Sequence, residues 1–436
     1  MKYVFPNSFL WGTATSAYQV EGNNDKSDMW AEEYSEGSPY RDYSGDAVDH
    51  YNRYKQDIEL MASLGLNSYR FSIEWARIEP EQGIYSQKEL DHYRDVIKVC
   101  YDNHITPVVT MMHFTSPQWL MQIGGWKNPK TADLFAKYCE VVFKEFGQDI
   151  PYVLTMNEVN LPVMLKELFI NMNFMPPVGM DAKSWTAPGW RESAAAKCGT
   201  TIDQYFTFHM ASDVESLEIV KDAHRKAREV MKKINPSTKV GLSLALPEIQ
   251  AIEGGDKQAA KVWHDYFGQF KSIIEGDDFI GVQNYTREVY GPEGQVPLAE
   301  GTEVTAMGYE FYPEALAGTI RNVAKELNIP VLVTEHGIAT NDDSRRVEFI
   351  QRGLKGMHSC LEDGIQVLGY LYWSTFDNYE WTFGYDPHFG IIGVNRETQE
   401  RKVKESGRVL GEISKNNTVY YEPEKLLNLY RREFEI

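Results

Sequence analysis

Cysteine is scarce in this chain, and its distribution excludes several classes of protein. The 436 residues include four cysteines, and no two of them form a CxxC pair or another spacing typical of metal ligands. A disulfide-rich secreted scaffold and a cysteine-bound zinc site are therefore excluded. Cys100, Cys139, Cys198 and Cys360 instead favour isolated reduced thiols in an intracellular protein. The ten histidines form no HExxH motif, so we expect neither a metal nor an organic cofactor.

Long apolar runs and an excess of basic residues are also missing. No stretch approaches the roughly 18 apolar residues of a membrane-spanning helix, and residues 1–7 lack the apolar core of a signal peptide. Lys and Arg number 44 against 63 Asp and Glu, which gives a formal net charge of −19. Such a surface repels nucleic acids and anionic membranes. We expect a cytoplasmic protein that binds neither of them and acts on a neutral small molecule. The oligomeric state stays open, a homo-oligomer included.

What the chain does have is a regular alternation of short β-rich runs and helical patterns. The predicted strands are residues 9–17, 68–74, 107–114, 152–158, 240–245, 279–285, 331–335 and 367–374. Helical periodicity predicts helices over residues 47–64, 88–103, 131–146, 216–233, 313–327 and 344–362. Strands that alternate with helices imply a parallel sheet, and a closed (β/α)8 TIM barrel is its natural form. We predict one such α/β domain over residues 1–436. An open doubly wound sheet is the alternative, although its Gly-rich phosphate turn is missing after the first strand.

Two glutamates stand at the ends of predicted strands. Glu158 closes the run 152–158, and Glu335 closes the run 331–335. A carboxyl at the end of a buried strand lies at the rim of the core, where burial and neighbouring charges shift its pKa. In a parallel barrel these ends meet at one face. Paired carboxyls are the working groups of glycoside hydrolysis. The alternative is two unrelated acids, one capping a helix and one in a surface salt bridge.

Six motifs follow one another along nearly the whole chain. They are FLWGTATSAYQVEG at 9–22, YRFSIEWARI at 69–78, HFTSP at 113–117, TMNE at 155–158, VTEHG at 333–337 and YWSTFDNYEW at 372–381. Together they resemble glycoside hydrolase family 1, the retaining β-glucosidases and β-glycosidases. The resemblance implies an enzyme that hydrolyses a small-molecule β-linked glycoside, with β-glucosides favoured, through a covalent glycosyl-enzyme intermediate.

The resemblance also implies a role for each matching position. Glu335 matches the nucleophile, and Glu158 matches the general acid/base. Arg70 and Tyr285 match groups that contact the nucleophile, and they would favour its anionic form. The remaining matches are substrate-binding positions: Gln19, His113, Asn157, Glu380 and Trp381 for the sugar hydroxyls, Trp373 as a stacking platform, Phe389 as an aromatic wall, and Gln283. Retention would require the two carboxyls to lie about 5–5.5 Å apart.

Four positions depart from the family pattern and leave the glycone open among glucose, galactose, fucose and glucuronate. His336 stands where Asn usually follows the nucleophile, Phe114 where Trp is common, and His388 where Arg is usual. Gln283 is aligned with a family Asn, but a shift of one residue would bring Thr286 to the nucleophile in place of Tyr285.

The segment 161–200 follows the acid/base strand and matches the family poorly. It contains Phe174, Trp185 and Trp190. We interpret it as a loop of the aglycone site, with a plain structural insertion as the alternative.

Two other functions stay open. A 6-phospho-β-glycosidase would need cations and hydroxyls for the phosphate where this chain has Glu380 and Trp381, and a carboxylate there repels phosphate. A catalytically dead, sugar-binding barrel is the third reading, although both glutamates are present. Release of nitrophenol from an aryl β-glucoside would distinguish an enzyme from such a module.

Overall fold

The fold is built on a parallel sheet that closes on itself. The computed structural model describes residues 1–170 and 189–421. Its central sheet has the order β6-β5-β4-β3-β2-β13-β12-β9-β7. Because Leu242 alone separates β6 from β7, the first and last members of this order are one stretch of chain, and the sheet is a closed barrel of eight strands. The predicted (β/α)8 barrel is confirmed, and the open sheet is excluded. The strands are β2 (Leu10–Ala14), β3 (Ser68–Ser72), β4 (Thr106–Thr110), β5 (Tyr152–Leu154), β6 (Lys239–Gly241), β7 (Ser243–Ala245), β9 (Ile280–Asn284), β12 (Val331–His336) and β13 (Val367–Trp373).

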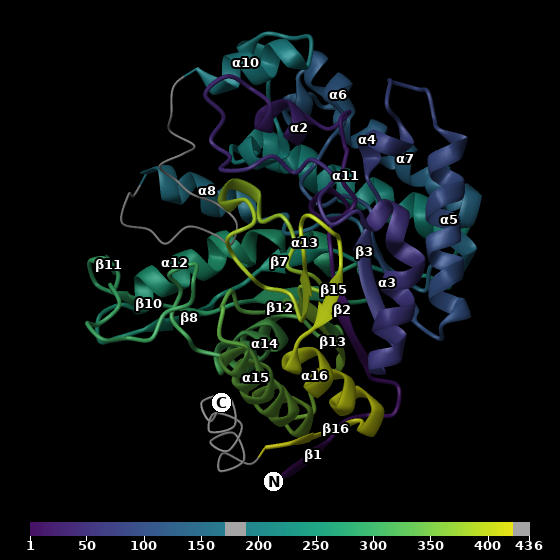
Figure 1. The fold of residues 1–436 in the computed structure, drawn as a ribbon. Helices are drawn as coiled ribbons and strands as arrows, with labels where there is room; N and C mark the ends of the chain where they lie inside the picture. Colours follow the sequence, from purple (N-terminus) through teal and green to yellow (C-terminus); the bar gives the residue numbers. More distant parts are fainter. Residues whose placement is uncertain (171–188, 422–436) are drawn as a thin grey trace.

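Amphipathic helices surround the barrel (Figure 1). They are α3 (His50–Leu64), α5 (Gln87–Asp102), α7 (Lys130–Phe146), α11 (Val214–Ile234), α14 (Ala315–Glu326), α15 (Asp343–Glu362) and α16 (Glu405–Asn416). Helix α11 shows why such segments become helices. Its buried positions include Leu217, Val220, Ala227 and Met231, whose spacing forms one apolar stripe. The Asp213 carboxylate caps the helix by accepting a hydrogen bond from the Ser216 N–H at 2.9 Å.

Each predicted strand occurs, but several were expected to extend too far. β5 ends at Leu154 and β4 at Thr110, not at Glu158 and Phe114. Phe114 and Glu158 have φ values of 73° and 43°, which a strand does not allow. The first strand ends at Ala14, and helix α1 (Ala17–Val20) follows it. The polar side chains expected at these strand ends therefore lie on the loops just beyond them.

The remaining elements were not predicted, and neither was helix α16. Two helices, α8 (Leu161–Ile170) and α10 (Trp190–Lys197), lie in the segment that was expected to be a loop. Trp190 is 1% exposed and belongs to the main core, whereas Phe174 and Trp185 lie outside the described residues. The others are α2 (Asp28–Glu33), α4 (Trp75–Ile78), α6 (Gln118–Gln122), α12 (Asp256–Tyr266), α13 (Lys271–Ile274), β1 (Lys2–Val4), β8 (Glu248–Ala251), β10 (Arg287–Gly291), β11 (Gly294–Gln295), β14 (Ile392–Val394), β15 (Arg401–Val403) and β16 (Thr418–Tyr420). Among the helices of residues 1–170 and 189–421, none is long and apolar enough to cross a bilayer.

Candidate active site

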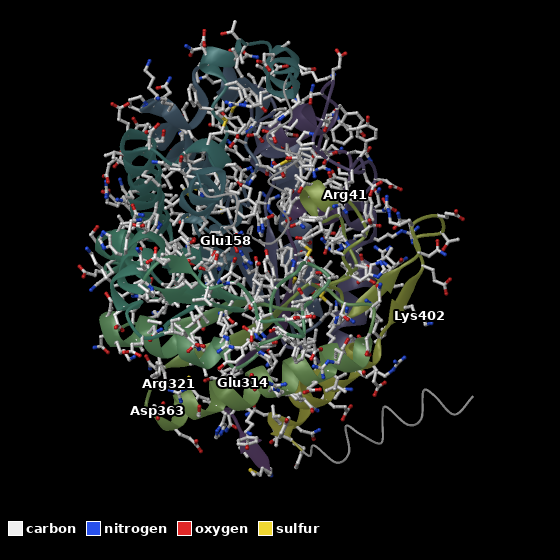
Figure 2. All side chains as sticks on the ribbon, turned by 90° about the vertical axis from the view of Figure 1, so that its left-hand side faces the viewer. Arg41, Glu158, Glu314, Arg321, Asp363 and Lys402 are labelled. Carbon is white, nitrogen blue, oxygen red and sulfur yellow. The ribbon has the colours of Figure 1, made fainter. Side chains whose placement is uncertain are left out.

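The carboxyl ends of the barrel strands bring the predicted acids together. Glu335 belongs to β12, and Glu158 follows β5. Both are buried, and Figure 2 shows Glu158 among side chains in the interior, while Arg321 and Asp363 lie at the periphery. The charge of Glu335 raises the pKa of Glu158, so both carboxyls belong to one site. The positive φ of Glu158 is an uncommon backbone conformation for a non-glycine residue.

The Glu335 carboxyl is held by two donors. Arg70 donates from Nη1 to Oε1 at 2.6 Å, and the Tyr285 hydroxyl donates to Oε2 at 2.5 Å. Thr286 instead donates to the carbonyl oxygen of Glu310 at 3.0 Å, so Tyr285 is the residue that reaches Glu335. Burial raises the pKa of Glu335, while the charge of Arg70 and the Tyr285 hydrogen bond oppose that rise.

Glu158 has a different environment. Burial and the charge of Glu335 raise the pKa of Glu158 well above its ordinary value, and the attraction of Arg70 offsets this only in part. Within the described part of the chain, no N–H or O–H group donates to its carboxyl. Glu335 therefore ionises first, and Glu158 keeps its proton.

Arg70 connects several parts of the site. Its side chain is 0% exposed. Besides its contact with Glu335, it donates from Nε to Thr110 Oγ1 at 3.0 Å and from Nη2 to Asn157 Oδ1 at 2.5 Å. The sequence analysis missed Thr110. The available signal was a polar residue at the end of the apolar run Pro107–Val109.

Several buried polar atoms of the site lack a hydrogen-bond partner within the described residues, Gln283 Oε1 and Trp373 Nε1 among them. Asn157 Nδ2 and His113 Nδ1 also have no hydrogen-bond partner among residues 1–170 and 189–421. Burial, followed by the charge of Arg70, lowers the pKa of His113 well below its ordinary value, so its ring is neutral. Since buried polar groups are nearly always hydrogen-bonded, these two atoms indicate a polar ligand such as a sugar hydroxyl.

Glu380 is a third buried carboxyl of the site. Gln19 of helix α1 donates to its Oε2 at 3.3 Å. Burial and the charge of Glu335 raise the pKa of Glu380 to about 8, against the opposing effects of Trp373 and Gln19. At neutral pH this group is therefore mostly a carboxylic acid, which both donates and accepts hydrogen bonds.

Aromatic rings line the same region. The His113 ring lies 5.7 Å from that of Trp373 and 6.3 Å from that of Trp381, measured between centroids. Phe389 packs in one cluster with Trp373 and Tyr285. Phe114, which replaces the usual Trp, lies 5.6 Å from Trp381. The predicted aromatic positions are thus close to one another.

His336 faces away from the two carboxyls. Its Nδ1 lies 2.8 Å from the Tyr370 hydroxyl, and its ring stacks on Phe349 at 4.4 Å. Burial lowers the pKa of His336 to about 3, so the ring is neutral. Successive side chains of a strand point to opposite faces, which explains why Glu335 faces the site and its neighbour the surrounding helices. His388, another departure, pairs with Asn341 through Nδ1 at 2.7 Å.

A closed parallel barrel with two buried glutamates at the carboxyl ends of its strands, Glu335 on β12 and Glu158 just beyond β5, is an arrangement typical of glycoside hydrolases. The chain matches the model of glycosyl hydrolase family 1 over residues 1–258 and 268–419, and it belongs to that family. It is therefore an O-glycosyl hydrolase, and it shares the family's retaining β-glycosidase activity.

This chain aligns with several named proteins over nearly its whole length. Beta-glucosidase A of Acetivibrio thermocellus is 32% identical, over 95% of this chain and 99% of that protein. The beta-glycosidase BGL167 has a crystal structure that superimposes on this one with a TM-score of 0.88. Its sequence is 45% identical, and the match covers 96% of this chain and 99% of that chain. The 6-phospho-beta-glucosidase GmuD of Bacillus subtilis is 29% identical, over 95% of this chain and 98% of that protein. A beta-glucosidase and a 6-phospho-beta-glucosidase are thus both similar to this chain over nearly its whole length. The residues of the site must therefore decide which sugar it accepts.

Proposed function

We propose that this chain hydrolyses neutral β-glycosides, β-glucosides above all, with Glu335 as the nucleophile and Glu158 as the general acid and then base. The observation that carries this assignment is the asymmetry between the two carboxyls. Glu335 accepts charge-stabilising hydrogen bonds from Arg70 and Tyr285, whereas burial and the charge of Glu335 keep Glu158 protonated. One group is prepared to attack and the other to give up a proton.

The reaction then follows in two displacements. Glu335 attacks the anomeric carbon, and the bond to the leaving oxygen breaks as that oxygen takes the proton of Glu158. The resulting ester removes the negative charge of Glu335, and with it one cause of the high pKa of Glu158. The ionised Glu158 next takes a proton from water, whose oxygen attacks the same carbon and releases Glu335. Two inversions at one carbon return the β configuration.

The glycone site favours a neutral sugar. Residues 380–389 include no Lys or Arg, and the three nitrogens of Arg70 are engaged with Thr110, Glu335 and Asn157. A phosphate at the sugar's O6 would thus meet Glu380 without a free cation in this segment. Burial of a phosphate without a compensating cation carries a large desolvation cost, whether or not Glu380 is ionised. The same residues offer hydrogen bonds to neutral hydroxyls, so we favour the neutral substrate over the 6-phospho alternative.

We further propose that the protein is cytoplasmic. The four cysteines are buried free thiols, which fits the reducing cytoplasm. The net charge of −19 supports a protein that binds neither nucleic acid nor an anionic membrane. A homo-oligomer stays open.

Chemical trapping tests the assignment of the nucleophile. An aryl 2-deoxy-2-fluoro-β-glucoside with an activated leaving group should inactivate the enzyme with one label per chain, located on Glu335. The fluorine disfavours the cation-like transition states of both steps, and the good leaving group restores only the first of them. Mass spectrometry of the digested protein identifies the labelled peptide. A label on another carboxyl would refute the assignment, and a chain that neither reacts nor turns over substrate would be the sugar-binding barrel.

Substitution of Glu380 tests the glycone proposal. We expect Glu380→Ala to lower kcat/KM for an aryl β-glucoside by about tenfold to a hundredfold, because one or two hydrogen bonds to the sugar's O4 and O6 are lost. The loss should be clearly smaller for the 6-deoxy sugar, which already lacks one of these contacts. Steady-state rates on both substrates and on the 6-phosphate measure this. Equal losses would show that Glu380 does not bind O6, and a wild-type preference for the 6-phosphate would replace the neutral-sugar proposal.

A further inference from the structure

We infer that Ser243 is a positioning residue of the active site, whose hydroxyl fixes the Asn157 amide in the orientation that presents Nδ2 to the substrate. This inference rests on the proposed function. Ser243 is the first residue of β7 and is 0% exposed, so it reaches the substrate only through its neighbours. It acts on the two residues Asn157 and Glu158, which follow the adjacent barrel strand.

The hydrogen-bonding capacity of the Ser243 hydroxyl is fully used. Its oxygen accepts from the backbone N–H of Glu158 at 3.2 Å and from Gln283 Nε2 at 3.0 Å. A serine hydroxyl has one proton and two lone pairs. With both lone pairs engaged, its proton is left for Asn157 Oδ1, which lies 3.3 Å away. The neighbours of Ser243 thus determine where its proton points.

This arrangement fixes the Asn157 amide. Its Oδ1 also accepts from Arg70 Nη2 at 2.5 Å and from Gln283 Nε2 at 2.7 Å. A flipped amide would place its own N–H groups against these donors, because an amide NH2 donates and cannot accept. The oxygen therefore faces the protein, and Nδ2, which has no partner in the described part of the chain, remains as the donor. Gln283 Nε2 donates to both Asn157 and Ser243, so this NH2 group supports the site and does not face the substrate.

Ser243 also holds the backbone on both sides of Asn157. Its N–H donates to the carbonyl of Met156 at 3.3 Å, and its carbonyl accepts from the Val159 N–H at 3.2 Å. Between these anchors, Glu158 has a φ of 43°. A strained conformation persists where its surroundings over-determine it, and the hydroxyl contact to the Glu158 N–H adds a third restraint.

The orientation of Asn157 bears on the rate of the chemical step. Arg70 contacts both Asn157 and Glu335, so the Asn157 amide lies beside the nucleophile. The sugar hydroxyl closest to the attacked carbon is the 2-OH, and hydrogen bonds to it strengthen in the transition state. Without the Ser243 hydroxyl, the hydrogen bonds from Arg70 and Gln283 to Asn157 Oδ1 remain, but the amide is less firmly oriented. Its contact with the 2-OH should then weaken mainly in the transition state, and kcat should fall more than KM rises.

A double-mutant cycle with Asn157→Ala tests this inference. On an activated aryl β-glucoside, whose departure needs little help from Glu158, Ser243→Ala should lower kcat about tenfold with KM changed by less than about twofold. In the Asn157→Ala background the same substitution should change kcat by less than about twofold, because the group it positions is gone. Ser68→Ala is the matched control. Ser68 is a buried serine of β3 whose hydroxyl has no partner within the described residues, and its loss should leave kcat unchanged.

Equal losses from Ser243→Ala in both backgrounds would overturn the inference, as would a change confined to KM. Ser243→Cys, which keeps the packing but offers only a weak donor, serves if the alanine variant does not fold. It should show the same dependence on Asn157. Failure of the proposed function gives a different result, because the wild type would then not hydrolyse the glycoside, or the fluorosugar label would not be on Glu335.

Discussion

Glu335→Gln is expected to abolish hydrolysis of an aryl β-glucoside, with a loss of several orders of magnitude in kcat. The amide is a poor nucleophile, so the glycosyl ester does not form, while Arg70 and Tyr285 keep partners of nearly the same shape. Release of nitrophenol measures the loss. The matched control is Glu314→Gln, since Glu314 pairs with Arg352 at 2.7 Å on the periphery of the molecule and should be dispensable for activity (Figure 2).

Retention of activity within about tenfold of the wild type by Glu335→Gln would refute its role as the nucleophile. Glu335 is buried and Glu314 is not, so substitution of Glu335 could also destabilise the fold. Thermal unfolding of both variants distinguishes such a folding defect from a catalytic loss.

Glu158→Gln should have the second-largest effect, and the effect should depend on the leaving group. Poor leaving groups need a proton, so we expect their kcat/KM to fall by about a hundredfold or more, within the usual range of general acid catalysis. Activated aryl groups depart without help, and their glycosyl-enzyme should then accumulate because no base activates water. Pre-steady-state bursts and a series of aryl glucosides measure this. Equal losses across the series would contradict the acid role.

The pH profile of Glu158→Gln provides a second readout of the same substitution. Burial and the charge of Glu335 raise the pKa of Glu158 well above its ordinary value, so the active protonated form persists to high pH and is lost as pH rises through that pKa. The wild-type kcat/KM should fall along this alkaline limb, which reports the coupled pair of carboxyls. The variant should lack the limb. A limb that persists unchanged would mean that another group titrates there.

The barrel was predictable because buried parallel strands are short and almost continuously apolar. The run Val331–Val333 is an example, and the helical periodicity between the strands was equally clear. The strand ends were less predictable. At Phe114 and Glu158 the backbone adopts a positive φ, and strand pairing stops before both residues. Helix α12 and the strands β8 and β10 also escaped prediction, since they belong to loops whose form depends on tertiary contacts.

The site was predictable where a residue carries its own signal. Glu158 and Glu335 stand out as acids at the ends of apolar runs, and family motifs surround them. Thr110 and Ser243 act through side chains on other strands, and the register between strands decides those contacts. Their signal is a polar residue within an apolar run. The same pattern fits Ser68, whose hydroxyl has no partner within residues 1–170 and 189–421.

The position of Arg70 has a consequence for how such enzymes diverge. Its guanidinium joins residues from four parts of the barrel rim: Arg70 itself, Thr110, Asn157 and Glu335. Few substitutions would preserve all of these hydrogen bonds, so we expect the residues around the nucleophile to change little during evolution. Glu380 and Trp381 belong to a separate segment beyond β13, and none of the Arg70 hydrogen bonds reaches it. Mutation can therefore change which sugar is accepted while inheritance conserves the chemistry, and a lineage can acquire new substrates without reinventing its reaction.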